Sequence, residues 1–380
     1  MARPRLDPDH ILTPAERAKR YRRQHGERVN QALRKRRKAA QTTQRASGSR
    51  LRVRLTQLDG ILPNMALMKL AAFHRARGDE VVFSRSPYRS PTEGEYDRVY
   101  GSAIFSFTAL RVKRFRAAFP DAIVGGTWNP ADAITVEDVV GDFDGLDYTP
   151  WPDFTASIGF TQRGCRLKCG FCVVPRKEGK PRTVATVPQI WRGKPWPKHL
   201  HLLDNDFFGQ PEEQWQARLT EIRDGGFKVC CNQGVNVRAV TPEAATALAS
   251  VQYTDDQFKR RRLYTACDNI GDEKVFFRGV DILAAAGIPP SHLLAYMLVG
   301  YERRETWEHV LYRFHRMADM RIRPFPMPFG DRRRGLPTGD IAGDFTGKTL
   351  GQFQRWAVRR LYTVVPFEQY DASMRAPRDG

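Results

Sequence analysis

The stretch Gly159-Phe-Thr-Gln-Arg-Gly-Cys-Arg-Leu-Lys-Cys-Gly-Phe-Cys-Val-Val-Pro175 places three cysteines, Cys165, Cys169 and Cys172, within eight residues. This CxxxCxxC spacing can bring three thiolates onto one short loop, with no fourth cysteine nearby. Thiolate sulfur suits iron–sulfur clusters and zinc. A structural zinc site is closed by four protein ligands. A cubane cluster held by only three leaves one iron open, so the loop predicts a metal centre that does chemistry, and hence an enzyme.

The same loop, with the aromatic Phe171 before its last cysteine, resembles the signature of the radical S-adenosylmethionine (radical SAM) family. The resemblance implies that the three cysteines hold a [4Fe–4S] cluster whose fourth iron is chelated by S-adenosylmethionine (SAM). It implies reductive cleavage of SAM to a 5′-deoxyadenosyl radical, with a flavodoxin- or ferredoxin-like protein as electron donor. In such enzymes the cofactor supplies the difficult step and the protein positions it. The resemblance leaves methylation, thiolation, rearrangement and oxidation open as reactions.

Length and composition set the broad class. The chain has 380 residues, of which 41% are hydrophobic and 27% are charged, as expected for a globular protein with two or three domains. The sequence contains neither a run of about 18 apolar residues nor a signal-peptide pattern, so we expect no membrane span and no secretion. Six cysteines, half of them in one loop, favour a reducing compartment over a disulfide scaffold, and the cytoplasm is the expected location.

Positive charge is concentrated at the start of the chain. Residues 1–50 hold 15 lysines and arginines against 4 acidic residues, which is +11 of the total net charge of +20. Thr13-Pro-Ala-Glu16 reads as a capped helix start, so this segment predicts a basic helical arm that ends in a linker at 41–50. Such charge favours nucleic acid as a partner, while a solvated tail is the alternative. We find no aromatic stacking platform in the sequence.

Residues 51–150 alternate between strand and helix patterns. The expected strands are 52–57, 80–84, 98–105 and 122–125, and the expected helices are 64–77 and 110–119. This alternation predicts a parallel, Rossmann-like sheet.

The segments 62–67 and 123–127 are similar to the cobalamin-binding-type domain that precedes many radical SAM domains. The DxHxxG motif of that domain is absent. His74 is instead expected on the surface of the first helix. The similarity leaves cobalamin binding open, since some such domains bind cobalamin without the motif and others bind none.

Residues 151–330 alternate again. The expected strands are 156–161, 199–203, 228–232, 262–266, 293–298 and 321–327. The radical SAM resemblance implies that they form a partial (β/α)6 barrel, with the site at the carboxyl ends of its strands. Residues 331–380 are expected to form a capping extension with a helix at 352–362. The predicted fold is therefore α/β throughout, apart from the arm.

Polar residues follow the second predicted barrel strand. The resemblance implies that Asp204, Asn205 and Asp206 meet the SAM amino group, and a charge-assisted bond from an ammonium group suits a carboxylate. A turn that caps the next helix is the alternative.

Other candidate SAM contacts lie after later strands. Asn236 and Arg238 are candidates for the SAM carboxylate, its ribose or the substrate, with a surface salt bridge as the alternative. The resemblance also implies that Gly300 lies beside the adenosine and that Phe171 packs on the adenine.

The remaining cysteines, Cys230, Cys231 and Cys267, lack a CxxC spacing and are expected to be core thiols. His199 and His201 are likewise expected in the core. A second class of function stays open at this stage, namely a nucleic-acid-binding protein whose metal cluster is structural.

Overall fold

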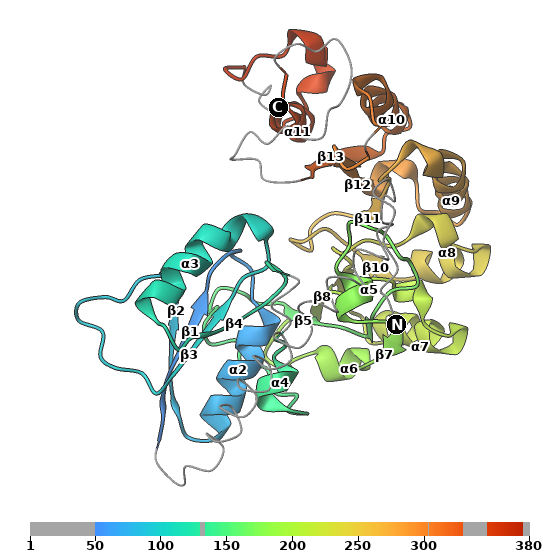
Figure 1. Cartoon of the computed structure of the whole chain (residues 1–380). Helices are drawn as coiled ribbons and strands as arrows, with labels where there is room; N and C mark the ends of the chain where they lie inside the picture. The colour runs from blue at the N-terminus through green and yellow to red at the C-terminus, as the bar shows by residue number, and fades with distance from the viewer. Residues whose placement is uncertain (1–49, 130–133, 303, 330–347, 375–380) are drawn as a thin grey trace, which may run out of the picture.

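The computed structural model describes residues 50–129, 134–302, 304–329 and 348–374. The predicted basic helical arm lies outside the described residues, apart from Arg50. The described chain is an α/β structure with several parallel sheets (Figure 1).

The first sheet has four parallel strands in the order β2-β1-β3-β4. They are β1 (Arg52–Gln57), β2 (Glu80–Ser84), β3 (Arg98–Ser102) and β4 (Ile123–Gly125). The helices α2 (Met65–Ala76) and α3 (Ala109–Ala118) lie on opposite faces of this sheet (Figure 1). The strand order reverses between β1 and β3, which is the arrangement of a doubly wound sheet. The expected Rossmann-like sheet is therefore present.

Local sequence explains the bounds of α2. The side chain of Asn64 accepts a hydrogen bond from the Leu67 amide at 3.2 Å and caps the helix start. Gly78, with a φ of +83°, follows the last turn, where a left-handed conformation favours glycine. Leu67 and Ala71 are fully buried against the sheet.

Strand β3 is shorter than predicted, because it ends at Ser102 rather than at residue 105. The carboxylate of Asp59 accepts hydrogen bonds from the amides of Ile104 and Phe105 at 2.8–2.9 Å. These amides are withdrawn from strand pairing and the chain turns into the short 3-10 helix η2 (Ser106–Thr108).

The second part of the chain contains two more parallel sheets. One has the order β10-β9-β8-β5 and the other β11-β12-β13. The strands are β5 (Ser157–Gly159), β8 (His199–Leu202), β9 (Lys228–Cys230), β10 (Gln252–Tyr253), β11 (Leu263–Ala266), β12 (Leu293–Val299) and β13 (Arg323–Pro328). All six predicted strands are present. Additional strands are β10 and the antiparallel pair β6 (Gln162–Arg163) and β7 (Arg182–Thr183). A hydrogen bond of 2.7 Å from the Val235 amide to the Tyr264 carbonyl links the two sheets.

Helices separate these strands along the chain. They include α7 (Glu212–Asp224), α8 (Pro242–Ala249), α9 (Glu273–Ala285) and α10 (Trp307–Asp319). A large apolar cluster joins them to the strands. In the sheets β10-β9-β8-β5 and β11-β12-β13 every strand runs in the same direction as its neighbour, so the carboxyl ends of each sheet's strands lie along one edge.

The described C-terminal residues contain the predicted helix as α11 (Leu350–Val358). It lies beside β13 and α10 (Figure 1). The amide of Gln354 donates to the Pro326 carbonyl at 2.7 Å, and the Trp356 ring packs 4.9 Å from the Phe314 ring. This helix therefore extends the apolar cluster of the second part.

Candidate functional site

The cysteine loop follows β5 and is held in a fixed course by its backbone. Gly164 has a φ of +87°, and a Cβ atom there would lie 2.3 Å from the Lys180 carbonyl oxygen, so only glycine fits. The Cys165 amide donates to the Gly179 carbonyl at 3.2 Å, and the Cys172 amide donates to the Cys169 carbonyl at 3.0 Å. All three thiols are therefore presented by one folded loop.

The three thiols are free and half-buried. Burial raises the pKa of Cys165 and of Cys169, and the negative charge of the neighbouring thiolates raises each pKa further. The Cys165 sulfur accepts a hydrogen bond from the Leu167 amide at 3.4 Å. Within the described ranges, no three side chains of His, Cys, Asp or Glu are close enough together to hold a metal ion. The thiols thus influence one another electrostatically without forming a closed ligand set.

This donor set suits an iron–sulfur cluster better than a bare ion. A cluster is larger than a single metal ion, and its irons take thiolate ligands. Mutual repulsion of three thiolates is relieved when they bind a cationic group. Three cysteines on one loop are the type of ligand that an iron–sulfur cluster takes.

Asp204 fixes the start of the cysteine loop. It is 5% exposed and accepts hydrogen bonds from the amides of Thr161 and Gln162 at 2.7 and 3.1 Å, and from the Thr161 hydroxyl. Burial raises the pKa of Asp204 to about 7. Its two oxygens are thus engaged with the chain that leaves β5, which is a positioning role that sequence reasoning did not assign.

Asp206 fixes the middle of the same loop. Its carboxylate accepts from Nε and Nη2 of Arg166 at 2.8 and 2.9 Å, and from the Arg166 amide at 3.1 Å. Asp206 is 1% exposed. A two-bond pairing of this kind sets the direction of the arginine as well as its position.

Asn205 lies between these two carboxylates and is only partly buried. The side-chain amide of Asn205 donates to the Glu178 carboxylate at 3.1 Å. Glu178 also accepts from the Gly164 amide at 3.0 Å and from Arg163 at 3.1 Å. The predicted SAM-binding trio is therefore brought beside the cysteine loop, with Asn205 as its most accessible member.

Arg238 brings the end of β9 to the cysteine loop. Its positive charge opposes the rise that burial causes in the pKa of Cys169. Arg238 also pairs with Asp272, and its Nε donates to Asn236 Oδ1 at 3.3 Å. The two predicted residues, Asn236 and Arg238, thus lie next to a predicted metal ligand.

A further carboxylate, Asp268, lies at the end of β11 and contributes negative charge at Cys169. Burial raises the pKa of Asp268, and its Oδ1 accepts from the Leu298 amide at 3.3 Å.

Gly300 directly follows β12 with a φ of +78°, and its amide donates to Glu305 at 2.7 Å. Glu305 forms a buried ion pair with Arg313. Arg313 also donates to the carbonyls of Cys267 and Leu298 at 3.0 and 3.1 Å. This network holds the ends of β11 and β12 together.

Phe171 packs against aromatic residues outside the cysteine loop. Its ring lies edge-on to Tyr301 at 5.3 Å, and Tyr301 lies edge-on to Phe329 at 4.9 Å. A Cβ atom at Gly170 would lie 2.5 Å from the Tyr301 hydroxyl oxygen. The aromatic group thus connects the cysteine loop with the residues that follow β12.

The core prediction is confirmed for Cys230, Cys267 and His201, whereas Cys231 and His199 are only partly buried. Cys230 and Cys267 are buried, and Cys231 is partly buried. His201 is buried between the rings of Phe154 and Phe258. His199 stacks on Phe258 at 4.4 Å.

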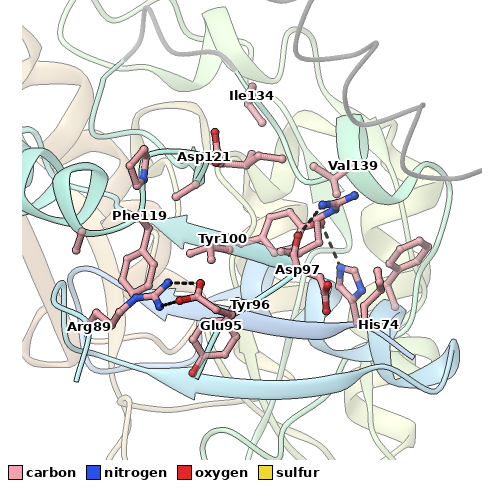
Figure 2. A pocket seen from close by; sticks show the side chains of 18 of the residues that line it. His74, Arg89, Glu95, Tyr96, Asp97, Tyr100, Phe119, Asp121, Ile134 and Val139 are labelled. Atoms are coloured by element: carbon pink, nitrogen blue, oxygen red, sulfur yellow. Dashed lines mark hydrogen bonds and ion pairs between the residues drawn. The ribbon is translucent and has the colours of Figure 1, made fainter. Parts of the chain in front are cut away.

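His74 is where the expectation was wrong, because it is 3% exposed rather than on the surface. Its Nδ1 pairs with Asp79 at 2.7 Å and its Nε2 with the Tyr100 hydroxyl at 3.3 Å. Both contacts lie beside a cavity of about 680 Å³ lined only by residues of the first domain. Figure 2 shows His74 and Tyr100 at this cavity, with the paired Arg89 and Glu95 along its wall. His74 is the sole histidine between residues 51 and 150, and both of its ring nitrogens are engaged by Asp79 and Tyr100.

No model of a known protein family matches the chain, and no curated protein matches it. Among the helices that the structure describes, none has both the length and the apolar character required to cross a bilayer.

Proposed function

We propose that the chain is a radical SAM enzyme in which Cys165, Cys169 and Cys172 hold a [4Fe–4S] cluster. The observation that carries the proposal is that the three free thiols lie on one loop that follows β5, a strand of a parallel sheet. The other three cysteines are located elsewhere, on β9 and after β9 and β11. Three protein thiolates leave one iron for SAM.

The strand arrangement supports the partial barrel. In the two larger sheets of the second part the strands are parallel and neighbours follow chain order, and helices lie between successive strands of each sheet along the chain. That is the pattern of successive β/α units, in which functional residues gather at the carboxyl ends of the strands.

Residues from three different strand ends support a SAM site beside the cysteine loop. Arg238, already next to Cys169, suits the SAM carboxylate because its fork of N–H donors matches a carboxylate. Asn205 offers a carbonyl oxygen to the ammonium group. Gly300, which lacks a side chain, permits close approach of the adenosine.

When bound, the cluster and SAM supply the electron and the 5′-deoxyadenosyl radical for hydrogen abstraction, with the electron from a flavodoxin- or ferredoxin-like donor. The chain's own residues hold the loop: Asp204 and Asp206 fix its course, and Phe171 packs against Tyr301. Cobalamin is not part of the proposal, since His74 is engaged by Asp79 and Tyr100.

Single replacement of each loop cysteine tests the proposal. After anaerobic reconstitution with iron and sulfide, the unaltered chain is expected to bind about four irons and to cleave SAM under dithionite. Cys165→Ala, Cys169→Ala and Cys172→Ala are each expected to lose the SAM cleavage. Cys267→Ala, which removes a buried thiol outside the loop, is the matched control and should retain it. Binding of one zinc and no iron would instead favour a structural metal site in a binding protein.

A further inference from the structure

The first domain presents apolar side chains to solvent at the carboxyl edge of its sheet. The exposed apolar residues of this region are Ile61, Leu62, Ile104, Phe105, Phe107 and Leu110. They follow β1 and β3, on either side of the point where the strand order reverses. Clustered exposed apolar side chains on a globular protein mark an interaction surface.

Phe105 and Phe107 form a stacked pair, named here the aromatic platform. Their ring centroids are 4.9 Å apart and the rings are inclined by 8°. The two side chains are 44% and 47% exposed, so ring surface is left open to solvent.

The aromatic platform is held by buried and polar contacts rather than by the rings alone. Asp59 accepts from the amides of Ile104 and Phe105 and from the Thr108 hydroxyl, at 2.8–2.9 Å. Thr108 is 5% exposed. A surface whose geometry is fixed beforehand loses less entropy when it binds.

Helix α3 continues the aromatic platform as a basic stripe. Arg114 follows Leu110 by four residues and Arg111 by three, so these three exposed side chains lie on one face of α3, directly after Phe107 in η2. The opposite face, with Val112 and Phe115, is buried.

Basic residues predominate on this surface, where Asp59 is engaged by the amides of Ile104 and Phe105. Residues 98–120 contain five lysines and arginines and no acidic residue. Arg111 also donates to the Arg85 carbonyl, and Arg85 donates to the Ile61 carbonyl at 3.1 Å. The loops after β1 and β2 and the helix after β3 are thereby joined into one surface.

We infer that this surface binds single-stranded RNA. Exposed aromatic rings stack on unpaired bases, and nearby arginines contact the phosphates. Bases of a duplex are stacked on each other and are closed to such rings, and cellular single strands are mainly RNA. The binding of RNA by this surface does not depend on the proposed function. The further inference that RNA is the substrate class does rest on the proposed function.

Fluorescence anisotropy with a short fluorescein-labelled single-stranded RNA of mixed sequence tests the inference on the full chain. The double variant Phe105→Ala/Phe107→Ala is expected to bind about tenfold more weakly for each base that loses its stacking partner. Phe105→Tyr/Phe107→Tyr keeps the rings and is expected to bind as the unaltered chain does. Equal urea midpoints for the variants verify that each is folded.

Charge is tested by Arg111→Gln/Arg114→Gln, which should lower the slope of log Kd against log salt by about 1.4. Lys274→Gln/Arg278→Gln removes the same charge from the exposed face of α9 and should leave the slope unchanged.

The inference is overturned if the alanine variant binds RNA as tightly as the unaltered chain. Tighter binding of single-stranded DNA or of duplex RNA would also contradict it, as would self-association through Phe105 and Phe107 without RNA binding. SAM cleavage measured without RNA tests the proposed function separately, so a chain that cleaves SAM and binds no RNA refutes this inference alone.

Discussion

Asp206, which follows β8, accepts two side-chain hydrogen bonds of 2.8 and 2.9 Å from Arg166 of the cysteine loop. The two residues are 40 positions apart, and their contact spans neighbouring strands β5 and β8. The carboxylate is 1% exposed, while the Arg166 side chain remains 42% exposed. The loop between Cys165 and Cys169 is therefore anchored to the body of the sheet.

Asp206→Asn is expected to loosen this anchor. The amide keeps the shape of the carboxylate but loses its charge and one acceptor, so we expect about 2 kcal/mol of destabilisation in urea unfolding. We also expect lower iron content after reconstitution. Asp224→Asn removes an exposed carboxylate paired with Arg223 at 2.8 Å and should change neither measurement. Unaltered iron content in Asp206→Asn would refute the anchoring role.

Arg238→Gln tests the contact proposed for the SAM carboxylate. A charge-assisted hydrogen bond contributes about 1.5–3 kcal/mol, so the reconstituted variant should bind SAM about tenfold to a hundredfold more weakly. Equilibrium dialysis of labelled SAM measures the affinity. Arg278→Gln, an exposed arginine on α9, is the control. Equal affinity in both variants would remove Arg238 from the site.

Glu305→Gln tests the network behind Gly300. The glutamine retains an acceptor for the Gly300 amide but leaves the buried Arg313 charge without its partner. Breaking a buried pair from one side costs about 3–5 kcal/mol, which should appear as a lower urea midpoint. Glu308→Gln changes an exposed glutamate at the start of α10, the helix that contains Arg313, and should have little effect on the urea midpoint. Equal stability of both variants would contradict a structural role for the pair.

His201 predicts a pH dependence of stability. Burial lowers the pKa of His201 to about 4, below its ordinary value of 6.5. The unfolded chain therefore takes up this proton at a higher pH than the folded chain does. The contribution of neutral His201 to the free energy of unfolding is fully present above pH 6.5. It is lost as the pH falls towards 4, and the loss is about 3 kcal/mol at most.

Urea unfolding of the unaltered chain and of His201→Phe across this range isolates the effect. Phenylalanine suits the space between the Phe154 and Phe258 rings and does not titrate. The difference in unfolding free energy between the two chains should shift in favour of the variant as the pH falls. A difference that stays constant with pH would exclude His201 as a source of the pH dependence of stability.

Much of the fold could be predicted because its signals are local. The apolar run of β12 and the Asn64 cap and Gly78 stop of α2 lie within their own segments. The burial of His74 is also indicated by local sequence, through its spacing from apolar residues of the same helix. It lies seven residues after Leu67 and three after Ala71, on the apolar face of the helix.

The arrangement around the cysteine loop could not be predicted in the same way. Thr161 and Asp204 are 43 residues apart, and only the pairing of β5 with β8 brings them together. The aromatic platform was missed for a related reason. An apolar run beginning in β3 indicated strand up to residue 105, whereas Asp59 withdraws the amides that a longer strand would need.

The central claim is that three thiolates hold a cluster with one iron left for SAM. Its most direct test is the anaerobic incubation of the reconstituted chain with SAM and dithionite, followed by chromatographic analysis of the products. We predict methionine and 5′-deoxyadenosine in equal amounts, and a change in the electron paramagnetic resonance signal of the reduced cluster when SAM is added. Intact SAM together with a cluster signal that SAM does not alter would contradict the account.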